Sequence, residues 1–529
     1  MNTFKKYLPD CLIFIILLII GIKISFHSEL ITDIDPFDES IYLFRGITIS
    51  PFIKHHLDGF FYYLWYNLIS HFTADNFELF FLNNNILFVL PGLLIFLFLR
   101  IIRTDILISF ISAAIYLVSS ANIFVIPLIT KFALCIILLG SIWIYKTKQP
   151  SDKLLIAVLL SFILIYIRPE FILSLFLNAG MYVYFIIRSY KAKPDNNCLR
   201  KFLPLILIAI IMIFFNPISR HRVNISFAQH YAKDVLERND NSKVNIDNIT
   251  RPDEIMQRDF LTDNSFSDAA INNPVLFIEH IGFNFFRSFN QIDETFPYII
   301  NENDNYTFLK NILYGLCILS LLTMCFFIVI RIKRKRFTTF SLIYISFVLP
   351  PLISVLIFYP RTHYVILIFT FILIYLSYEI SSRLNAKNMY KKNSFSVTLV
   401  FGLLIIILLP FRAESGSIHL AECTRLHTAK ELNKFDFNGK VNFFTVGPGI
   451  VTFLANDWKY VSDDMLELPI DEFFYKKNVN LILVNKYFFN HPLIINNKEV
   501  ERILYDTSYV RFDIDGCDSY LLAKKEILN

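Results

Sequence analysis

The stretch Leu12-Ile-Phe-Ile-Ile-Leu-Leu-Ile-Ile-Gly-Ile22 decides the fold, because it is the first of many apolar runs of membrane-spanning length. With its flanks it covers residues 8–26, and an α-helix needs about 20 apolar residues to cross a bilayer. No small-residue cleavage site follows the run, and acidic residues come soon after it, so we expect an uncleaved span and not a signal peptide. Hydrophobic residues make up 55% of the 529-residue chain, which excludes an ordinary soluble protein.

Similar runs predict about eleven transmembrane helices, and hence a polytopic α-helical membrane protein. A shorter aromatic segment at 59–72 is predicted to be an interfacial helix. The spans are expected near residues 8–26, 78–99, 105–122, 125–145, 153–170, 171–189, 202–217, 308–330, 338–358, 363–381 and 394–411.

The Lys and Arg residues predict the orientation of these spans. Alternate loops are basic, and basic loops stay in the cytoplasm. The N-terminus is therefore expected inside, while loops 27–77 and 218–307 and the segment after 411 face out. The net charge of +5 comes from these short loops, so nucleic-acid binding is not expected. A composition rich in Ile, Asn, Lys and Phe suggests a bacterial inner (plasma) membrane, with the C-terminus periplasmic.

The chain divides into a transmembrane module at 1–411 and an extracytoplasmic soluble domain at 412–529. Residues 441–446 and 479–485 are predicted to be buried strands, and 469–477 a helix, which together indicate a small C-terminal α/β domain. Cys423 and Cys517 share the oxidising side and are a disulfide candidate, with two free thiols as the alternative.

An acidic loop follows the first span, in Asp33-Ile-Asp-Pro-Phe-Asp-Glu-Ser-Ile-Tyr42. It holds Asp33, Asp35, Asp38 and Glu39. Carboxylates at a membrane surface suit acid/base chemistry. Asp38 could instead be a stabilising charge at the N-terminus of a helix.

Cationic and polar side chains gather at the outer ends of the predicted spans, against the positive-inside trend. Such groups could bind a lipid-linked phosphate. The alternative is that each one snorkels to the interface. The residues are Lys131, Arg168, Glu170, Arg220, Arg361 and His363.

Asp33-Ile-Asp35 is similar to the Asp-x-Asp pair by which some sugar transferases hold a metal and a nucleotide sugar. Nucleotide sugars are cytosolic and this loop is expected outside, so the predicted donor is lipid-linked and no cofactor is required. A divalent metal at Asp33 and Asp35 stays the alternative, and no Cys/His spacing indicates a zinc site.

The acidic loop resembles the first outer loop of the GT-C superfamily of polyprenyl-phosphate-sugar glycosyltransferases, which includes the aminoarabinose and protein O-mannosyl transferases. Asp38, Glu39 and Tyr42 match its Asp-Glu-x-x-Tyr pattern. Residues 56–63 fall where the family has a His-Pro-Pro-Leu-Tyr-Tyr type segment, with Asp58 and Gly59 replacing the prolines. Arg168-Pro-Glu170 and Arg361-Thr-His-Tyr364 also match in order, so the resemblance covers about the whole chain.

The resemblance implies an inverting glycosyltransferase of the cell envelope. Its donor would be a polyprenyl-phosphate sugar, and its acceptor a surface polysaccharide, an O-antigen or a lipid. Asp38 would be the general base and Glu39 would orient the loop or the acceptor. Tyr42 and Asp58 would join the cationic residues in binding substrate.

Two other classes remain open. An O-antigen polymerase or ligase also works on the outer face with basic loops. A transporter or flippase should show repeats, broken helices or midplane charges. Within loop 218–307, residues 273–289 are expected on the membrane and Phe227-Ala-Gln-His230 on a surface helix, with acceptor binding as the alternative for this loop and for Phe227-Ala-Gln-His230.

Overall fold

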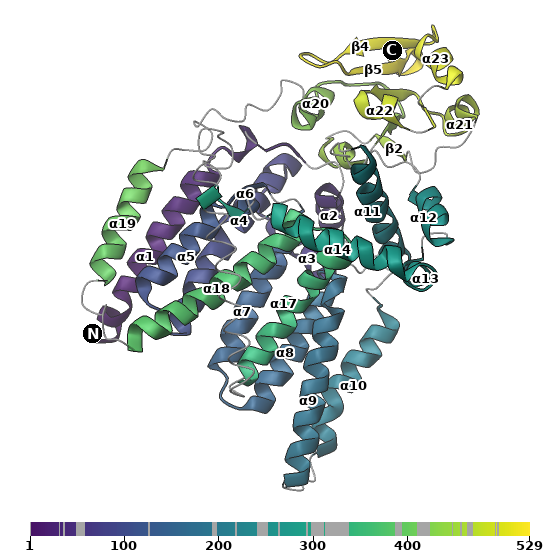
Figure 1. Cartoon of the computed structure of the whole chain (residues 1–529). Helices are drawn as coiled ribbons and strands as arrows, with labels where there is room; N and C mark the ends of the chain where they lie inside the picture. The colour runs from purple at the N-terminus through teal and green to yellow at the C-terminus, as the bar shows by residue number, and fades with distance from the viewer. Residues whose placement is uncertain are drawn as a thin grey trace.

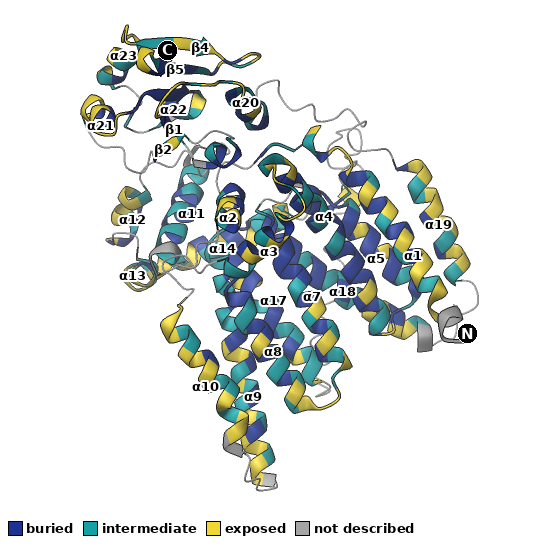
Figure 2. Ribbon diagram, turned by 180° about the vertical axis from the view of Figure 1, so that it is seen from behind, coloured by how far each residue is buried: buried dark blue, intermediate teal, exposed yellow. Residues whose placement is uncertain are grey.

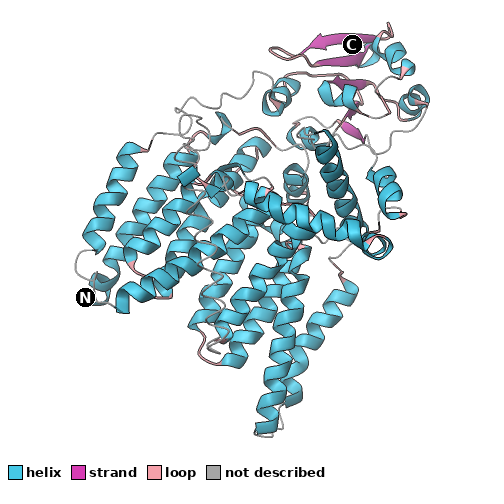
Figure 3. Cartoon of the chain, viewed as in Figure 1, coloured by secondary structure: helices cyan, strands magenta, loops and turns pink. Residues whose placement is uncertain are grey.

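A computed structural model shows a mainly helical chain (Figures 1 and 3). Among the residues it describes, all the strands belong to one sheet near the C-terminus. The described residues are 2–30, 32–34, 38–48, 59–124, 127–192, 198–216, 220–240, 252–262, 265–291, 295–297, 311–312, 338–386, 394–409, 424–446, 448–454, 458–462, 469–491, 493–494 and 497–528.

Within these residues, six helices are long and apolar enough to cross a membrane. They are α1 (Asn2–Ser25), α4 (Asn76–Ile101), α7 (Ile129–Lys146), α9 (Ile172–Ala192), α17 (Thr339–Ile357) and α18 (Thr362–Ala386). Four shorter helices coincide with other predicted spans: α5 (Ile106–Val118), α8 (Pro150–Ile165), α10 (Cys198–Phe214) and α19 (Ser394–Leu408). The span predicted at 308–330 lies outside the described residues, apart from 311–312. The class of helical membrane protein is confirmed, and the total of about eleven spans stays a prediction.

The helices form one bundle with a buried centre. Helix α4 packs against α1, α5 and α7, helix α8 against α7 and α9, and helix α17 against α9 and α18. Buried residues concentrate in α4, α5, α7 and α8, whereas α10 and α19 at the two flanks are widely exposed (Figure 2). The exposed side chains of α10 and α19 include Phe214 and Leu408, which suit contact with lipid.

Small polar residues join the helices inside this bundle. The hydroxyl groups of Ser112 on α5 and Ser377 on α18 lie 2.6 Å apart. Asn178 on α9 donates to Ser161 on α8 at 2.9 Å and accepts from Ser346 on α17 at 3.0 Å. Hydrogen bonds of this kind stabilise helix association in a membrane, where lipid tails are as apolar as the helix surfaces.

Two short helices, α2 (Asp38–Ile47) and α3 (Phe60–Ile69), pack together at one end of the bundle. Gly46 permits this approach, because a Cβ there would lie 2.3 Å from the Cβ of Tyr66. Helix α3 corresponds to the helix predicted at 59–72. One of its faces is buried against the core and the other exposes apolar residues such as Leu68.

The described residues of the outer loop predicted at 218–307 form four helices around a small core of Phe227, Tyr231, Met256 and Phe260. The surface position predicted for residues 227–230 is wrong. Phe227 is fully buried and His230 is 5% exposed, because the other helices of the loop pack against α11. The helices are α11 (Arg220–Asp240), α12 (Pro252–Phe260), α13 (Phe266–Asn272) and α14 (Pro274–Asn290).

Helix α14 covers most of the segment predicted to lie on the membrane. Val275, Ile278 and Phe286 are all strongly exposed on it, and Phe286 reaches 70%. An apolar exposed face suits an interfacial helix, and its contact with lipid stays a prediction.

The C-terminal part is a five-stranded sheet of order β2-β1-β3-β5-β4. Strand β1 pairs in parallel with β2 and β3, whereas β5 pairs antiparallel with β3 and β4. The two predicted strands are confirmed as β1 and β3, whose residues are all buried, and the predicted helix as α21. The elements are β1 (Asn442–Thr445), β2 (Lys459–Ser462), β3 (Leu481–Val484), β4 (Tyr509–Asp513), β5 (Tyr520–Lys524), α20 (Arg425–Leu432), α21 (Ile470–Lys476), α22 (Lys486–Asn490), α23 (Lys498–Leu504) and the 3₁₀ segment η7 (Pro448–Phe453).

The sheet domain packs against the end of the bundle that carries α2 (Figure 1). Phe453 of η7 is buried and stacks on Phe77 of α4, with ring centroids 5.1 Å apart. Asn76 donates to the carbonyl oxygen of Thr452 at 2.7 Å. Asp33, in the first loop, accepts from the backbone N–H groups of Arg425 at 3.0 Å and Leu426 at 2.9 Å, at the N-terminus of α20. The first loop and the C-terminal domain are thus joined next to α2.

Candidate active site

Asp38 and Glu39 are the first residues of α2, and their side chains lie in opposite environments. Asp38 is exposed, whereas Glu39 is 0% exposed. Successive helical residues point about 100° apart, so neighbouring carboxylates on one helix separate in this way. Only Asp38 is therefore available to a substrate arriving from outside the bundle, as the sequence suggested for one of the two.

Glu39 accepts hydrogen bonds from three segments of the chain. The hydroxyl groups of Tyr62 and Tyr66 on α3 each donate to Oε1 at 2.5 Å, and the Asn83 amide on α4 donates at 3.2 Å. The backbone N–H of Leu128, before α7, donates to Oε2 at 2.7 Å. Burial, and then the Glu39 charge, raise the pKa of both tyrosines well above the ordinary value, so both stay hydrogen-bond donors. Glu39 thus anchors α2 to α3, α4 and α7.

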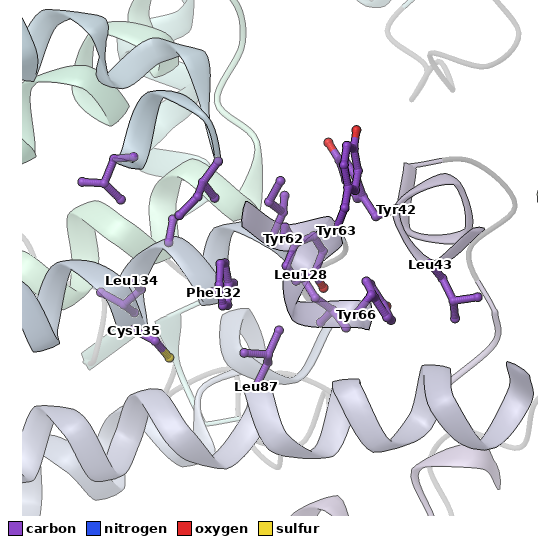
Figure 4. Close-up of a cluster of buried hydrophobic side chains, with 14 of the residues drawn as sticks. Tyr42, Leu43, Tyr62, Tyr63, Tyr66, Leu87, Leu128, Phe132, Leu134 and Cys135 are labelled. Atoms are coloured by element: carbon purple, nitrogen blue, oxygen red, sulfur yellow. The ribbon is translucent and has the colours of Figure 1, made fainter. Parts of the chain in front are cut away.

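Asp38 lies near a group of tyrosines and one arginine. Burial raises the pKa of Tyr63, Asp38 adds to this rise, and Arg45 opposes it. Arg45 donates to the Tyr63 hydroxyl at 2.7 Å. The rings of Tyr42 and Tyr63 are 5.7 Å apart, and Figure 4 shows their hydroxyl groups pointing the same way, out of the apolar cluster. The carboxylate of Asp38 thus lies within electrostatic range of Tyr63, whose hydroxyl accepts from the cation Arg45.

Arg168, in the turn between α8 and α9, connects the ends of several helices. It is buried, and its Nε donates to Glu170 at 2.5 Å. Its guanidinium group also donates to Thr130 of α7 and lies 4.8 Å from the ring centre of Tyr364 on α18. Tyr42 of α2 is within electrostatic range as well. Arg168 therefore brings α2, α7 and α18 to one point.

Arg361 and His363 lie at the turn between α17 and α18, close to this point. The buried His363 is within electrostatic range of Arg168, Arg361 and His230. The structure thus brings together Arg168, Glu170, Arg361, His363 and Tyr42, which the sequence predicted to bind substrate.

A buried network that the sequence did not reveal supports Arg361. Asp234 on α11 is fully buried and lies 2.8 Å from Nδ1 of His280 and 2.7 Å from Nη1 of Arg287, both on α14. Nε2 of His280 lies 3.1 Å from the carbonyl oxygen of Ile357, at the end of α17. This network fixes α11 and α14 to the α17–α18 turn. The amphipathic spacing of α14 could have indicated that one of its faces, which carries His280, is buried. No local pattern in the sequence links Asp234 to His280.

Tyr359 belongs to the same supported turn. Its hydroxyl donates to Glu237 of α11 at 3.1 Å, and burial, followed by Glu237, raises its pKa to about 12. The side chain of Lys233 lies over the Tyr359 ring at 4.7 Å. Tyr359 is therefore held against α11, two residues before Arg361.

Lys131 follows Thr130, the α7 residue that accepts from Arg168, and its role in binding the phosphate stays a prediction. It is fully buried, its ammonium group donates to the carbonyl oxygen of Asn122, and it lies 5.8 Å from the ring centre of Phe88. These contacts give Lys131 a place between α4 and α7, inside the bundle. Arg220 begins α11, and Asp58 lies outside the described residues.

The alternative metal site receives no support from the described residues, which contain no group of three or more His, Cys, Asp or Glu able to hold a metal ion. Asp33 accepts the backbone bonds of α20 described above, which gives it a role at the domain junction. Asp35 lies outside the described residues.

Of the two predicted disulfide partners, Cys517 is disulfide-bonded. Cys423 lies outside the described residues, so the pairing of Cys423 with Cys517 stays a prediction. A cross-link at this place would join the segment before α20 to the turn before β5, and it would constrain the unfolded chain over the intervening loop.

Comparison with protein-family models finds no match to this chain. Comparison with curated proteins finds none either.

Proposed function

We propose that this protein is a membrane glycosyltransferase that moves a sugar from a polyprenyl-phosphate donor to an acceptor at the outer membrane surface. The observation that carries the proposal is the arrangement along α2. Its first residue, Asp38, is an exposed carboxylate, and Tyr42, one turn later, lies within electrostatic range of the buried Arg168. A carboxylate at the start of α2 and a cation within electrostatic range of its next turn suit a displacement between an acceptor hydroxyl and a phosphate leaving group.

In the proposed reaction, Asp38 takes the proton of the acceptor hydroxyl as its oxygen attacks the anomeric carbon. The bond from that carbon to the phosphate oxygen breaks, and its electron pair stays on the phosphate. Arg168 and Arg361 stabilise the charge that develops there. A single displacement inverts the anomeric centre. The resemblance to the GT-C superfamily in Asp38, Glu39 and Tyr42 supports the same assignment.

The test is sugar transfer by the purified, reconstituted protein. Polyprenyl-phosphate sugars would be supplied with envelope glycan and lipid fractions as acceptors, and release of polyprenyl phosphate would be measured together with the anomeric configuration of the product. We expect transfer with inversion and no use of nucleotide sugars. Turnover of only diphosphate-linked glycans would contradict the proposal and favour the O-antigen polymerase or ligase class.

A first prediction concerns the donor phosphate. Arg361→Gln and Arg168→Gln should each weaken the binding of polyprenyl phosphate by about 1–3 kcal/mol, the value of a charge-assisted hydrogen bond. Arg511→Gln is the matched control, because Arg511 is exposed in the C-terminal domain. Binding can be measured by titration in nanodiscs and needs no knowledge of the sugar. Unchanged affinity in both variants would move the phosphate site elsewhere.

A second prediction concerns topology. Arg100, Arg103, Lys146 and Lys148 lie at the α4–α5 and α7–α8 turns, and basic turns of this kind stay in the cytoplasm. A reporter fused after Lys148 should behave as cytoplasmic, and one fused at the C-terminus as external. If both reporters are found on the same side, the predicted orientation is wrong and the proposed reaction at the outer surface fails.

A further inference from the structure

His230 on α11 has a buried nitrogen that lacks a hydrogen bond. The side chain is 5% exposed, and its Nδ1 has no hydrogen-bond partner among the residues that the structure describes. Its ring stacks on Tyr359, with centroids 5.8 Å apart and an angle of 16° between the planes. Buried polar atoms are nearly always paired, so the unpaired nitrogen of His230 requires an explanation, and a bound partner would supply one.

The groups that face His230 are mostly cationic. Arg361 approaches from the α17–α18 turn, Lys233 from the same helix and His280 from α14. Together with burial, which has the largest effect, they hold the pKa of His230 well below its ordinary value. The imidazole is therefore neutral at physiological pH and carries one N–H.

The fourth neighbour, His363 on α18, connects this group to the phosphate site. His363 is within electrostatic range of His230, Arg361 and Arg168. Asp234 pairs with His280 and Arg287, and Glu237 accepts from Tyr359 and lies 3.7 Å from Lys233. Neither carboxylate is among the groups that act on His230. A cationic surrounding with one free imidazole nitrogen suits an anion.

We propose that His230 is a further substrate-binding residue, which donates its ring N–H to the phosphate of the lipid-linked donor as the sugar departs. This inference rests on the proposed transferase function. The donor phosphate is a diester with one negative charge. When the anomeric C–O bond breaks, the electron pair stays on oxygen, and the lipid product is a monoester of about −1.5 to −2 charge. The hydrogen bond from the His230 N–H to that oxygen strengthens as the negative charge develops, and this lowers the activation barrier of sugar transfer.

The experiment compares two lipid phosphates with the full-length protein in nanodiscs. One is polyprenyl phosphate, a monoester, and the other is its methyl diester. His230→Phe keeps a ring to stack on Tyr359 but has no N–H. Its affinity for the monoester should fall by about 10- to 30-fold, with a smaller loss for the diester. His230→Gln, which keeps an N–H donor, should recover part of the loss. His71→Phe, at an exposed histidine, is the matched control.

The outcomes separate the inference from the function on which it rests. If the wild-type protein binds neither lipid phosphate, the proposed function fails. If it binds the monoester and His230→Phe binds it equally well, the role of His230 is overturned while the function stands. An equal loss for both lipids without recovery in His230→Gln means a structural role and also overturns it. Inorganic phosphate that binds as tightly as the lipid monoester would reassign the site to a free anion.

Discussion

Asp38→Asn should give a folded, membrane-inserted protein whose sugar transfer is about 10²- to 10⁴-fold slower than that of the wild type, the usual contribution of a general base. The amide keeps the shape of the carboxylate but cannot take the acceptor proton. Asp38 is exposed, and it is Glu39 and not Asp38 that accepts the buried bonds of α2, so the fold should tolerate the change. Binding of polyprenyl phosphate should survive, because Arg168 and Arg361 are unchanged.

The measurement is turnover of a polyprenyl-phosphate sugar by reconstituted enzyme, beside a titration of polyprenyl phosphate. Asp518→Asn is the control, since Asp518 is an exposed aspartate of the C-terminal domain. Near-normal turnover of Asp38→Asn would rule out this base. If Asp35→Asn abolished activity instead, and a divalent metal became necessary, the chemistry would belong to the Asp33–Asp35 pair.

The helices and the buried strands could be predicted because their signals are local. A long run of apolar residues such as 12–22 predicts a membrane-spanning helix. A short apolar run such as 479–485 predicts a buried strand. The basic turns add an orientation in the same local way. These signals need no knowledge of which segments meet in space.

The contacts of the site could be predicted only in part, because polar partners are chosen by tertiary packing. The sequence singled out Glu39 but not Tyr62, Tyr66 or Asn83, which come from two other helices. Aromatic residues at helical spacing in α3 indicated only an apolar face. Three buried hydroxyl and amide donors meeting one carboxylate is a property of the packed bundle.

For two charged residues, the sequence predicted a role in the site but not the partners that the fold supplies. The sequence predicted Lys131 as a phosphate ligand because it is a cation near the end of a span, and it did not predict that the ammonium group donates to the carbonyl oxygen of Asn122. The sequence predicted Asp33 as part of a possible metal pair, and it did not predict that Asp33 accepts the first backbone N–H groups of α20, which are far away along the chain. A pattern of charged residues identifies candidates for a functional site, but the role of each depends on the partners that it contacts in the fold.

Glu39→Gln should destabilise the protein by about 2–4 kcal/mol, because the amide group replaces an acceptor with a donor in a buried shell of donors. The Tyr62 and Tyr66 hydroxyl groups and the Leu128 N–H all point at the carboxylate, and at least one of them would lose its partner. Glu39→Ala should cost more, about 3–5 kcal/mol, since it removes every bond and leaves a cavity. Transfer should fall in both variants because α2 carries Asp38.

Unfolding in detergent by denaturant measures this cost, with Glu472→Gln at an exposed glutamate as the control. A double-mutant cycle of Glu39→Gln with Tyr66→Phe isolates the interaction between these two side chains. The double variant should lose less stability than the sum of the two single losses, by about 0.5–3 kcal/mol. Additive losses would mean that the Tyr66 bond does not couple to Glu39. A Glu39→Gln variant of wild-type stability that had nonetheless lost transfer would make Glu39 a group that acts on substrate, and the assignment of the base to Asp38 alone would then be wrong.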